Sequence, residues 1–110
     1  MPRTAPVVSY TQIRNYAEKF SWLDPKTKRR VVGYEVPKDA IDLQRVPFHI
    51  KWITLKGKTM EADAITLEVN TGLHMRNLGV LDQEGNTHGD GIWVYDMFIL
   101  EIDGVRFQNH

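Results

Sequence analysis

The longest apolar run of this 110-residue chain lies near its end, over Ile92–Phe107. Its β-branched and aromatic residues favour strands, and Asp103-Gly104 is a dipeptide that readily takes the two positive-φ positions of a type I′ turn. The pattern therefore predicts a hairpin around this turn, entered by a strand over Phe98–Ile102. Because a two-residue turn fixes the register, it also predicts which residues lie opposite one another. These pairs are Ile102–Val105, Leu100–Phe107 and Glu101–Arg106.

One charged residue interrupts the alternation within this run. Asp96 has the parity of Val94 and Phe98, so a single flat strand would place its carboxylate on an apolar face. The interruption predicts a bulge or a short turn near Asp96.

Alternating apolar and polar positions also predict strands earlier in the chain. The first covers Phe48–Trp52 and ends before a turn at Lys56-Gly57-Lys58. The second covers Thr59–Val69, the third covers about His74–Leu81, and a polar loop follows over residues 82–91. Five short strands joined by turns are typical of a small closed or partly open barrel, in which closure removes the sheet edges. We therefore expect a mainly β fold, with a barrel core over residues 48–110.

The first half of the chain shows a helical pattern instead. Ser9 and Gln12 fit a capping box, and an apolar stripe follows at i, i+3, i+4 and i+7. The stripe consists of Ile13, Tyr16, Ala17 and Phe20. It predicts one helix of about residues 10–23 within the segment 9–24, ended by Asp24-Pro25. We expect the stripe to cover an opening or edge of the barrel, and the alternative is a helix that binds a partner.

Residues 25–47 are predicted as a basic loop, a short strand over Val31–Val36 and a connection. Four of the five residues in Lys26–Arg30 are basic. Together with a nearby aromatic ring they could clamp the phosphates of a nucleic acid, and the alternative is a solvated loop. The candidate binding residues are Lys26, Lys28, Arg29, Arg30 and Tyr34. Residues 37–47 are expected to form a helical turn or a loop that packs its apolar groups on the core.

The last strand raises the question of a free sheet edge. Val105–Asn109 contains neither proline nor lysine, the residues that commonly protect an edge. We expect it to close onto the strand that begins at Phe48 or the one that begins at Val31. The alternative is a strand-mediated oligomer.

Composition fits one domain over residues 1–110, in which residues 1–8 form a flexible arm. The chain is 42% hydrophobic and has no cysteine, which excludes disulfides and thiolate metal sites. It shows neither a signal peptide nor a transmembrane run, so a cytoplasmic or virion-associated protein is expected. Residues 1–46 carry nine Lys/Arg and five Asp/Glu, a net +4, whereas residues 47–110 carry five and nine, a net −4. The two halves therefore either pack against each other or present different charges to partners.

Four segments of the second half carry a resemblance to a known group of proteins. They are KW-x-T-x-x-G over Lys51–Gly57, EADAITLEV, RNLGVL and FILEIDGVRF. Over about residues 46–109 the chain resembles small SH3-like barrel proteins of unknown function from Bacteroidales and from their phages or mobile elements. The resemblance implies an SH3-like barrel and no agreed activity. Compared with those proteins, the chain has an additional N-terminal extension and a longer loop over residues 82–91.

Few residues carry recognisable chemistry. Asp82, Glu84, Asn86, His88 and Asp90 alternate like the first ligands of a calcium loop. Thr87 and Trp93 stand where an EF-hand needs glycine and glutamate, so a plain hairpin loop is the favoured interpretation. Glu61 and Asp63 share one face of a strand and are interpreted as solvated surface. No catalytic, nucleotide-binding or zinc motif is present, so we expect no enzyme and no cofactor.

Three tryptophans, Trp22, Trp52 and Trp93, can serve either as core residues or as a ligand platform, and a core role is favoured for each. With catalysis disfavoured, the sequence predicts a protein–protein interaction or assembly module. The resemblance implies a small structural or accessory protein of a phage or mobile element. The alternative is a nucleic-acid-binding protein that uses residues 26–30.

Overall fold

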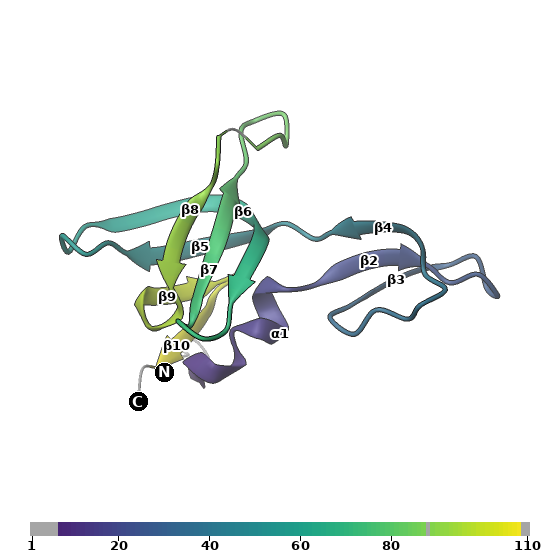
Figure 1. The fold of residues 1–110 in the computed structure, drawn as a ribbon, viewed down its shortest axis with the longest axis horizontal. Helices are drawn as coiled ribbons and strands as arrows, with labels where there is room; N and C mark the ends of the chain where they lie inside the picture. The colour runs from purple at the N-terminus through teal and green to yellow at the C-terminus, as the bar shows by residue number, and fades with distance from the viewer. Residues whose placement is uncertain (1–6, 88, 109–110) are drawn as a thin grey trace, which may run out of the picture.

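The structure is a computed structural model that describes residues 7–87 and 89–108. It confirms a mainly β protein with one short N-terminal α-helix (Figure 1). In chain order the elements are β1 (Val7–Ser9), the 3₁₀ helix η1 (Tyr10–Gln12), α1 (Arg14–Ala17), β2 (Phe20–Leu23), β3 (Arg30–Gly33), β4 (Ile41–Arg45), β5 (Phe48–Ile53), β6 (Thr59–Asn70), β7 (Met75–Val80), β8 (Ile92–Tyr95), the 3₁₀ helix η2 (Asp96–Phe98), β9 (Ile99–Ile102) and β10 (Val105–Gln108). No helix in this part of the chain is long and apolar enough to cross a bilayer.

Seven strands form the body of the molecule, a mixed sheet in the order β1-β10-β9-β5-β6-β7-β8. The long strand β6 pairs with two different strands along its length. Residues 59–64 pair with β5, and residues 64–70 pair with β7. Figure 1 shows β7 and β8 crossing in front of the β5–β6 pair, so the sheet folds over on itself. Among the described strands it does not close into a barrel, since β1 and β8 remain as its edges.

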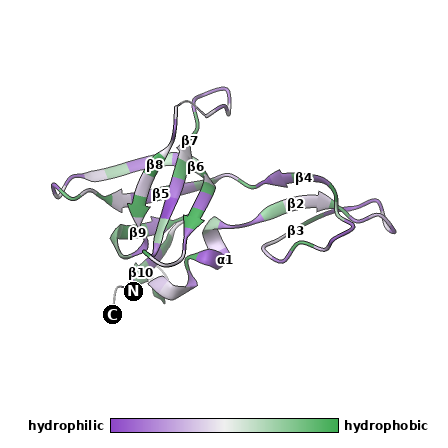
Figure 2. Ribbon diagram, in the orientation of Figure 1, coloured by the Kyte–Doolittle hydropathy of each residue, from purple (hydrophilic) through white to green (hydrophobic). Residues whose placement is uncertain are grey.

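The core lies on the concave side of this sheet and follows the predicted alternation. In β5 the side chains of Phe48, Ile50 and Trp52 are buried, whereas His49 between them is exposed. Figure 2 shows the same stripes of hydrophobic and hydrophilic residues along the strands of the body. The buried cluster consists of Ile13, Ala17, Phe48, Ile50, Trp52, Ala64, Leu78, Val94, Ile99 and Ile102.

The predicted C-terminal hairpin is confirmed in its turn and register. Asp103 and Gly104 have φ values of 49° and 83°, and Ile102 pairs with Val105 as expected. The register also contains the expected pair Glu101–Arg106, but not the expected pair Leu100–Phe107, which would have placed Leu100 on the same face as the buried Ile102. Along β5, Lys51 pairs with Glu101 but Trp52 pairs with Ile99, so Leu100 occupies a bulge. The extra residue reverses the parity, and Ile99 enters the core while Leu100 stays exposed.

The interruption predicted at Asp96 is confirmed as η2. This short turn lets the Asp96 carboxylate leave the apolar face and accept hydrogen bonds from the Arg76 guanidinium, with an Nε–Oδ1 distance of 2.8 Å. Arg76 is itself buried and also contacts Glu18, with an Nη1–Oε2 distance of 3.2 Å. One buried cation therefore joins β7, η2 and the segment that follows α1.

The predicted helix over residues 10–23 is largely wrong. The capping box does not form, because the Ser9 hydroxyl accepts from the Thr11 N–H and the Gln12 side chain bonds Asn15 instead. Helical structure ends at Ala17, where the Thr66 hydroxyl donates to the last carbonyl at 2.6 Å. Beyond it, residues 20–23 form a strand, because Phe and Trp pack well in a sheet and two neighbours offer pairing.

The first part of the predicted stripe nevertheless covers the core as expected. Ile13 and Ala17 are buried in it, and the Tyr16 ring packs edge-on against Phe107 with centroids 5.4 Å apart. The stripe therefore works as a lid over one short turn of helix. Phe20 lies outside the lid, in β2.

The second sheet has the order β3-β2-β4 and projects from the body; we call it the wing (Figure 1). The predicted strand at Val31–Val36 is shorter and begins at Arg30. The expected helical turn or packed loop over residues 37–47 is wrong for Ile41–Arg45, which form strand β4 with exposed side chains. Its residues pair with β2 and do not pack on the body core.

The last strand closes, but onto a partner that was not predicted. The outer side of β10 pairs in parallel with β1, from Val7 opposite Arg106 to Ser9 opposite Gln108. Neither β5 nor β3 takes this role. The arm predicted over residues 1–8 thus contributes Val7 and Val8 to the sheet, while its residues 1–6, like Asn109, lie outside the described residues.

Candidate interaction surfaces

An apolar groove lies between β8 and the β5–β6 hairpin. It has a volume of about 510 Å³, and apolar atoms make up most of its wall. Leu55 in the hairpin is 82% exposed and Trp93 in β8 is 43% exposed, so large apolar side chains are accessible on both sides of the groove. The lining residues are Trp52, Ile53, Thr54, Leu55, Lys56, Lys58, Met75, Ile92, Trp93, Val94, Tyr95 and Phe98.

The three tryptophans divide between core and surface. Trp22 and Trp52 are buried, as favoured from the sequence, and Trp93 is exposed in the groove. The sequence could not tell which tryptophan is buried and which is exposed. The exposure of Trp93 depends on how β8 lies against the β5–β6 hairpin.

The wing exposes apolar side chains on both of its faces. Trp22 is buried, and a Cβ atom added at Gly33 would lie 3.3 Å from its ring, so the absence of a side chain there leaves room for the indole. Four aliphatic residues remain between 37% and 57% exposed. They are Val31, Val32, Ile41 and Leu43.

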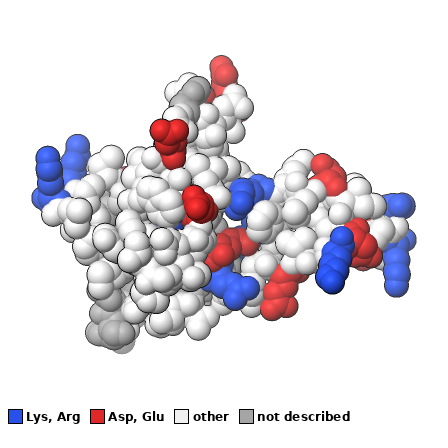
Figure 3. Space-filling view, in the orientation of Figure 1, with Lys and Arg blue, Asp and Glu red and all other residues white. Residues whose placement is uncertain are grey.

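The predicted phosphate clamp is only partly brought together. Lys26, Lys28 and Arg29 lie exposed in the β2–β3 turn at the outer end of the wing. Asp24 shapes that turn, since its side chain accepts from the Lys26 N–H at 2.8 Å and its carbonyl accepts from the Lys28 N–H at 2.8 Å. Figure 3 shows Lys and Arg gathered at this end and at the tip of the β5–β6 hairpin.

Arg30 and Tyr34 form contacts away from the basic turn. The Arg30 guanidinium forms an ion pair with Asp42 and donates to the Ser21 hydroxyl at 3.0 Å, which fastens β3 to β4 across β2. Tyr34 follows the opposite end of β3, where the Arg14 guanidinium lies 5.3 Å from its ring centroid. Four strand residues span about 13 Å, so Tyr34 lies at the end of β3 that is away from the basic turn.

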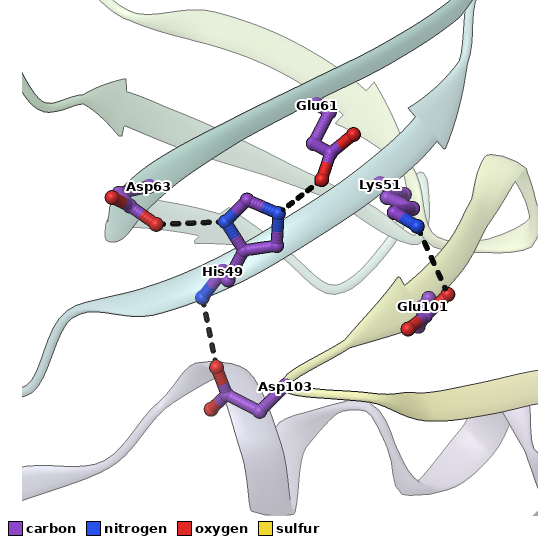
Figure 4. A network of polar contacts seen from close by, with 6 residues as sticks. All are labelled: His49, Lys51, Glu61, Asp63, Glu101 and Asp103. Carbon is purple, nitrogen blue, oxygen red and sulfur yellow. Dashed lines mark hydrogen bonds and ion pairs between the residues drawn. The ribbon is translucent and has the colours of Figure 1, made fainter. Parts of the chain in front are cut away.

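A charged cluster covers the outer face of the body sheet (Figure 4). The His49 imidazole lies between two carboxylates of β6, with Nδ1 2.8 Å from Asp63 Oδ1 and Nε2 2.5 Å from Glu61 Oε1. Lys51 and Glu101 form a further ion pair at 3.7 Å. Both ring nitrogens of His49 are engaged, so neither is free to take a proton from a substrate.

The Asp103 turn is tied to the same strand. Its carboxylate accepts from the His49 N–H at 2.9 Å, and its own N–H donates to the His49 carbonyl at 2.8 Å (Figure 4). These two bonds extend the contact between β5 and the C-terminal hairpin beyond Ile102. The cluster therefore stabilises the sheet, and the predicted solvated face of Glu61 and Asp63 also holds a histidine.

The His49 cluster should make stability depend on pH. The carboxylates of Asp63 and then Glu61 accept hydrogen bonds from the imidazole and so raise the pKa of His49 above its usual value, and the bond from His49 lowers the pKa of Glu61. Because the pKa of His49 is raised in the folded protein, its protonated form stabilises the fold fully below the ordinary histidine pKa of about 6.5. This stabilisation is lost as pH rises through the pKa of His49 in the folded protein. The contribution from Glu61 is lost as pH falls through its lowered pKa.

We therefore expect the melting temperature to fall as pH rises above about 6.5, and to fall less in H49Q, which keeps a hydrogen-bonding side chain without the charge. NMR titration of the imidazole checks the pKa directly. Equal pH profiles for the two proteins would contradict a role for His49. Glutamine at His74, which is exposed in the β6–β7 turn, provides the control.

Asp82 fixes the first turn of the predicted loop, over residues 82–86. The Asp82 carboxylate accepts from the N–H groups of Glu84 and Asn86, both at 2.9 Å. Within residues 7–87 and 89–108 no cluster of histidines and carboxylates is arranged to hold a metal ion. His88, which completes the calcium-like spacing, lies outside the described residues.

A signal for the His49 cluster was present in the sequence. A hairpin centred on Lys56 places residue 49 opposite residue 63, and this is the observed register. The groove and the wing gave no comparable local signal. Comparisons with protein-family models, curated proteins and solved structures found no match to this chain.

Proposed function

We propose that the protein is a non-enzymatic protein–protein interaction and assembly module, built on a partly open SH3-like barrel. In this proposal it serves as a small structural or accessory component of a phage or mobile element and associates with further copies of itself through the wing. The proposed role in a phage or mobile element rests on the sequence resemblance. The choice of the wing as the binding surface rests on its exposed apolar side chains.

The wing is the observation that carries this proposal. A sheet normally buries its apolar side chains against a second layer. Figure 1 shows no helix or second sheet stacked on the wing, and Val32 and Leu43 are about half exposed. Its outer strands β3 and β4 are also unpaired on one side in the described chain, so they can template further strands. Both features are removed when a partner covers the wing.

The division of charge favours another copy as that partner. The half of the sequence that contains the wing has a net charge of +4, and the half that contains most of the body sheet has −4. A wing that docks on a second molecule therefore brings a basic end toward an acidic body. Contacts between unlike surfaces produce rings or filaments, which suits an assembly component.

Introducing charge on the wing should abolish association without unfolding the protein. Val32 and Ile41 lie on the same face of the wing, next to Ser21 and Leu23 of β2. We expect the mass measured by light scattering to exceed the 12.7 kDa monomer as concentration rises. The variant V32D/I41D should remain monomeric and melt within a few degrees of the original chain, because exposed positions contribute little to stability.

L73D is the matched control, since Leu73 is 58% exposed in the β6–β7 turn, outside the wing. A chain that stays at the monomer mass at millimolar concentration would exclude self-assembly. The alternative function predicts a different result, in which single-stranded DNA or RNA binds at low salt through Lys26, Lys28 and Arg29 and is released as salt rises. No binding at low salt would eliminate that alternative.

A further inference from the structure

The strand β8 leaves one backbone edge free. It pairs with β7 alone, in a register that places Val94 opposite Arg76. The Asp96 N–H donates to the His74 carbonyl at 2.8 Å, and backbone groups of an antiparallel strand alternate in direction. The groups of Val94 therefore face β7, and those of Trp93 and Tyr95 face outward. No other described strand pairs with that side.

The apolar groove runs along this free edge. All four residues of β8 line it, although successive side chains of a strand point to opposite faces. A wall made from both faces of one strand means that the groove follows the edge of the strand. The opposite wall comes from Trp52–Lys56 and Lys58 of the β5–β6 hairpin. The groove thus combines a row of backbone donors and acceptors with apolar walls.

The charged residues that line the groove are both lysines. Lys56 and Lys58 line its hairpin end, and neither forms an ion pair with any residue that the structure describes. Among the residues that the structure describes, no aspartate or glutamate lines the groove. An occupant with carboxylates at this end would complement both lysines.

We propose that this groove binds an extended peptide segment of another protein, which adds a strand to β8 and directs an acidic end toward Lys56 and Lys58. Alternate side chains of the peptide, large and apolar, fill the groove beside Leu55 and Trp93. The edge presents carbonyls as well as N–H groups, which suits a peptide backbone and disfavours a polyanion. The inference rests on the proposed function only in that both surfaces bind protein.

Two peptide pools test the stated chemistry. Each pool contains eight-residue peptides in which large apolar residues at randomised positions alternate with threonine. One pool ends in two aspartates and the other in two lysines. We expect affinity selection on the full chain to recover members of the aspartate pool, and their affinity to fall with added salt. In K56E/K58E the recovered peptides should bind at least tenfold more weakly.

A pair of variants at Tyr95 tests strand addition. Tyr95 has φ −70°, which proline adopts without strain, so Y95P removes the outward N–H and leaves the pairing of β7 with β8 intact. Y95A removes the same ring contact with Phe98 and keeps the N–H. We expect fluorescence polarisation of a labelled peptide to show about tenfold weaker binding to Y95P than to Y95A, with equal melting temperatures for the two variants.

The outcomes of these experiments separate the groove proposal from its alternatives and from the proposed function. Equal affinities of Y95P and Y95A would exclude strand addition, and equal recovery from both pools would exclude the acidic end. Recovery from neither pool would exclude a peptide of this chemistry. If the protein self-associates, and Y95P abolishes this association while V32D/I41D retains it, the occupant of the groove would be a second copy of the chain. Peptide binding that V32D/I41D retains, in a chain that stays monomeric, would support the groove while removing assembly through the wing.

Discussion

Replacing Ile13 with alanine is expected to lower the free energy of unfolding by about 2–5 kcal/mol. Ile13 is 1% exposed and belongs to the core cluster of the body sheet, although it lies in the N-terminal lid. Truncation removes buried contacts and leaves a cavity that the surrounding strands fill only in part. Urea denaturation of I13A measures the loss, with an unchanged m-value as evidence that the unfolding transition is the same.

The control for this prediction is L73A, because Leu73 is large, aliphatic and exposed. Its unfolding free energy should stay within about 0.5 kcal/mol of the original value. An I13A protein as stable as L73A would show that the N-terminal segment does not pack on the body in solution. The lid would then be available to a partner, which is the alternative interpretation of its apolar stripe.

Removing the buried charge of Arg76 should have a comparably large effect. We expect R76M to lose about 3–5 kcal/mol, because Asp96 and Glu18 would keep their negative charges without the cation that compensates them. Methionine is unbranched and retains most of the apolar contact of the arginine stem. Thermal and urea unfolding give the magnitude.

A double-mutant cycle separates the ion pair from packing. In R76M/D96N one unpaired carboxylate is replaced by a neutral amide, so the double variant should be more stable than the sum of the two single losses predicts. Additive losses would show that the Arg76–Asp96 contact contributes no coupling energy. An R76M protein as stable as the original chain would show that solvent satisfies both carboxylates.

Local signals were sufficient for much of the body sheet. The Asp103-Gly104 turn determines the C-terminal hairpin, because few dipeptides take two positive φ values in succession. Alternation in β5 predicts its buried face, and Gly57 marks the turn into β6 with φ 82°. The interruption at Asp96 likewise predicts η2, since a carboxylate cannot remain on a buried face. Each of these features depends on neighbours in sequence.

Long-range pairing decided the features that sequence patterns did not predict. The helical stripe beyond Ala17 becomes strand because β3 and β4 offer hydrogen-bonding partners to residues 20–23. The arm joins β10 although almost the whole chain separates them, and no local pattern encodes such a parallel contact. Leu100 is exposed because its bulge arises only in pairing with β5.

The candidate surfaces follow the same division. The composition of the basic turn and the positions of the tryptophans are readable from the sequence, and so is the opposition of His49 and Asp63 in a hairpin. The groove exists only because the sheet folds over on itself and brings the free edge of β8 beside the β5–β6 hairpin. The exposure of the wing likewise depends on its strands pairing with one another and not with the body, because burial is a property of packed layers and not of a single strand.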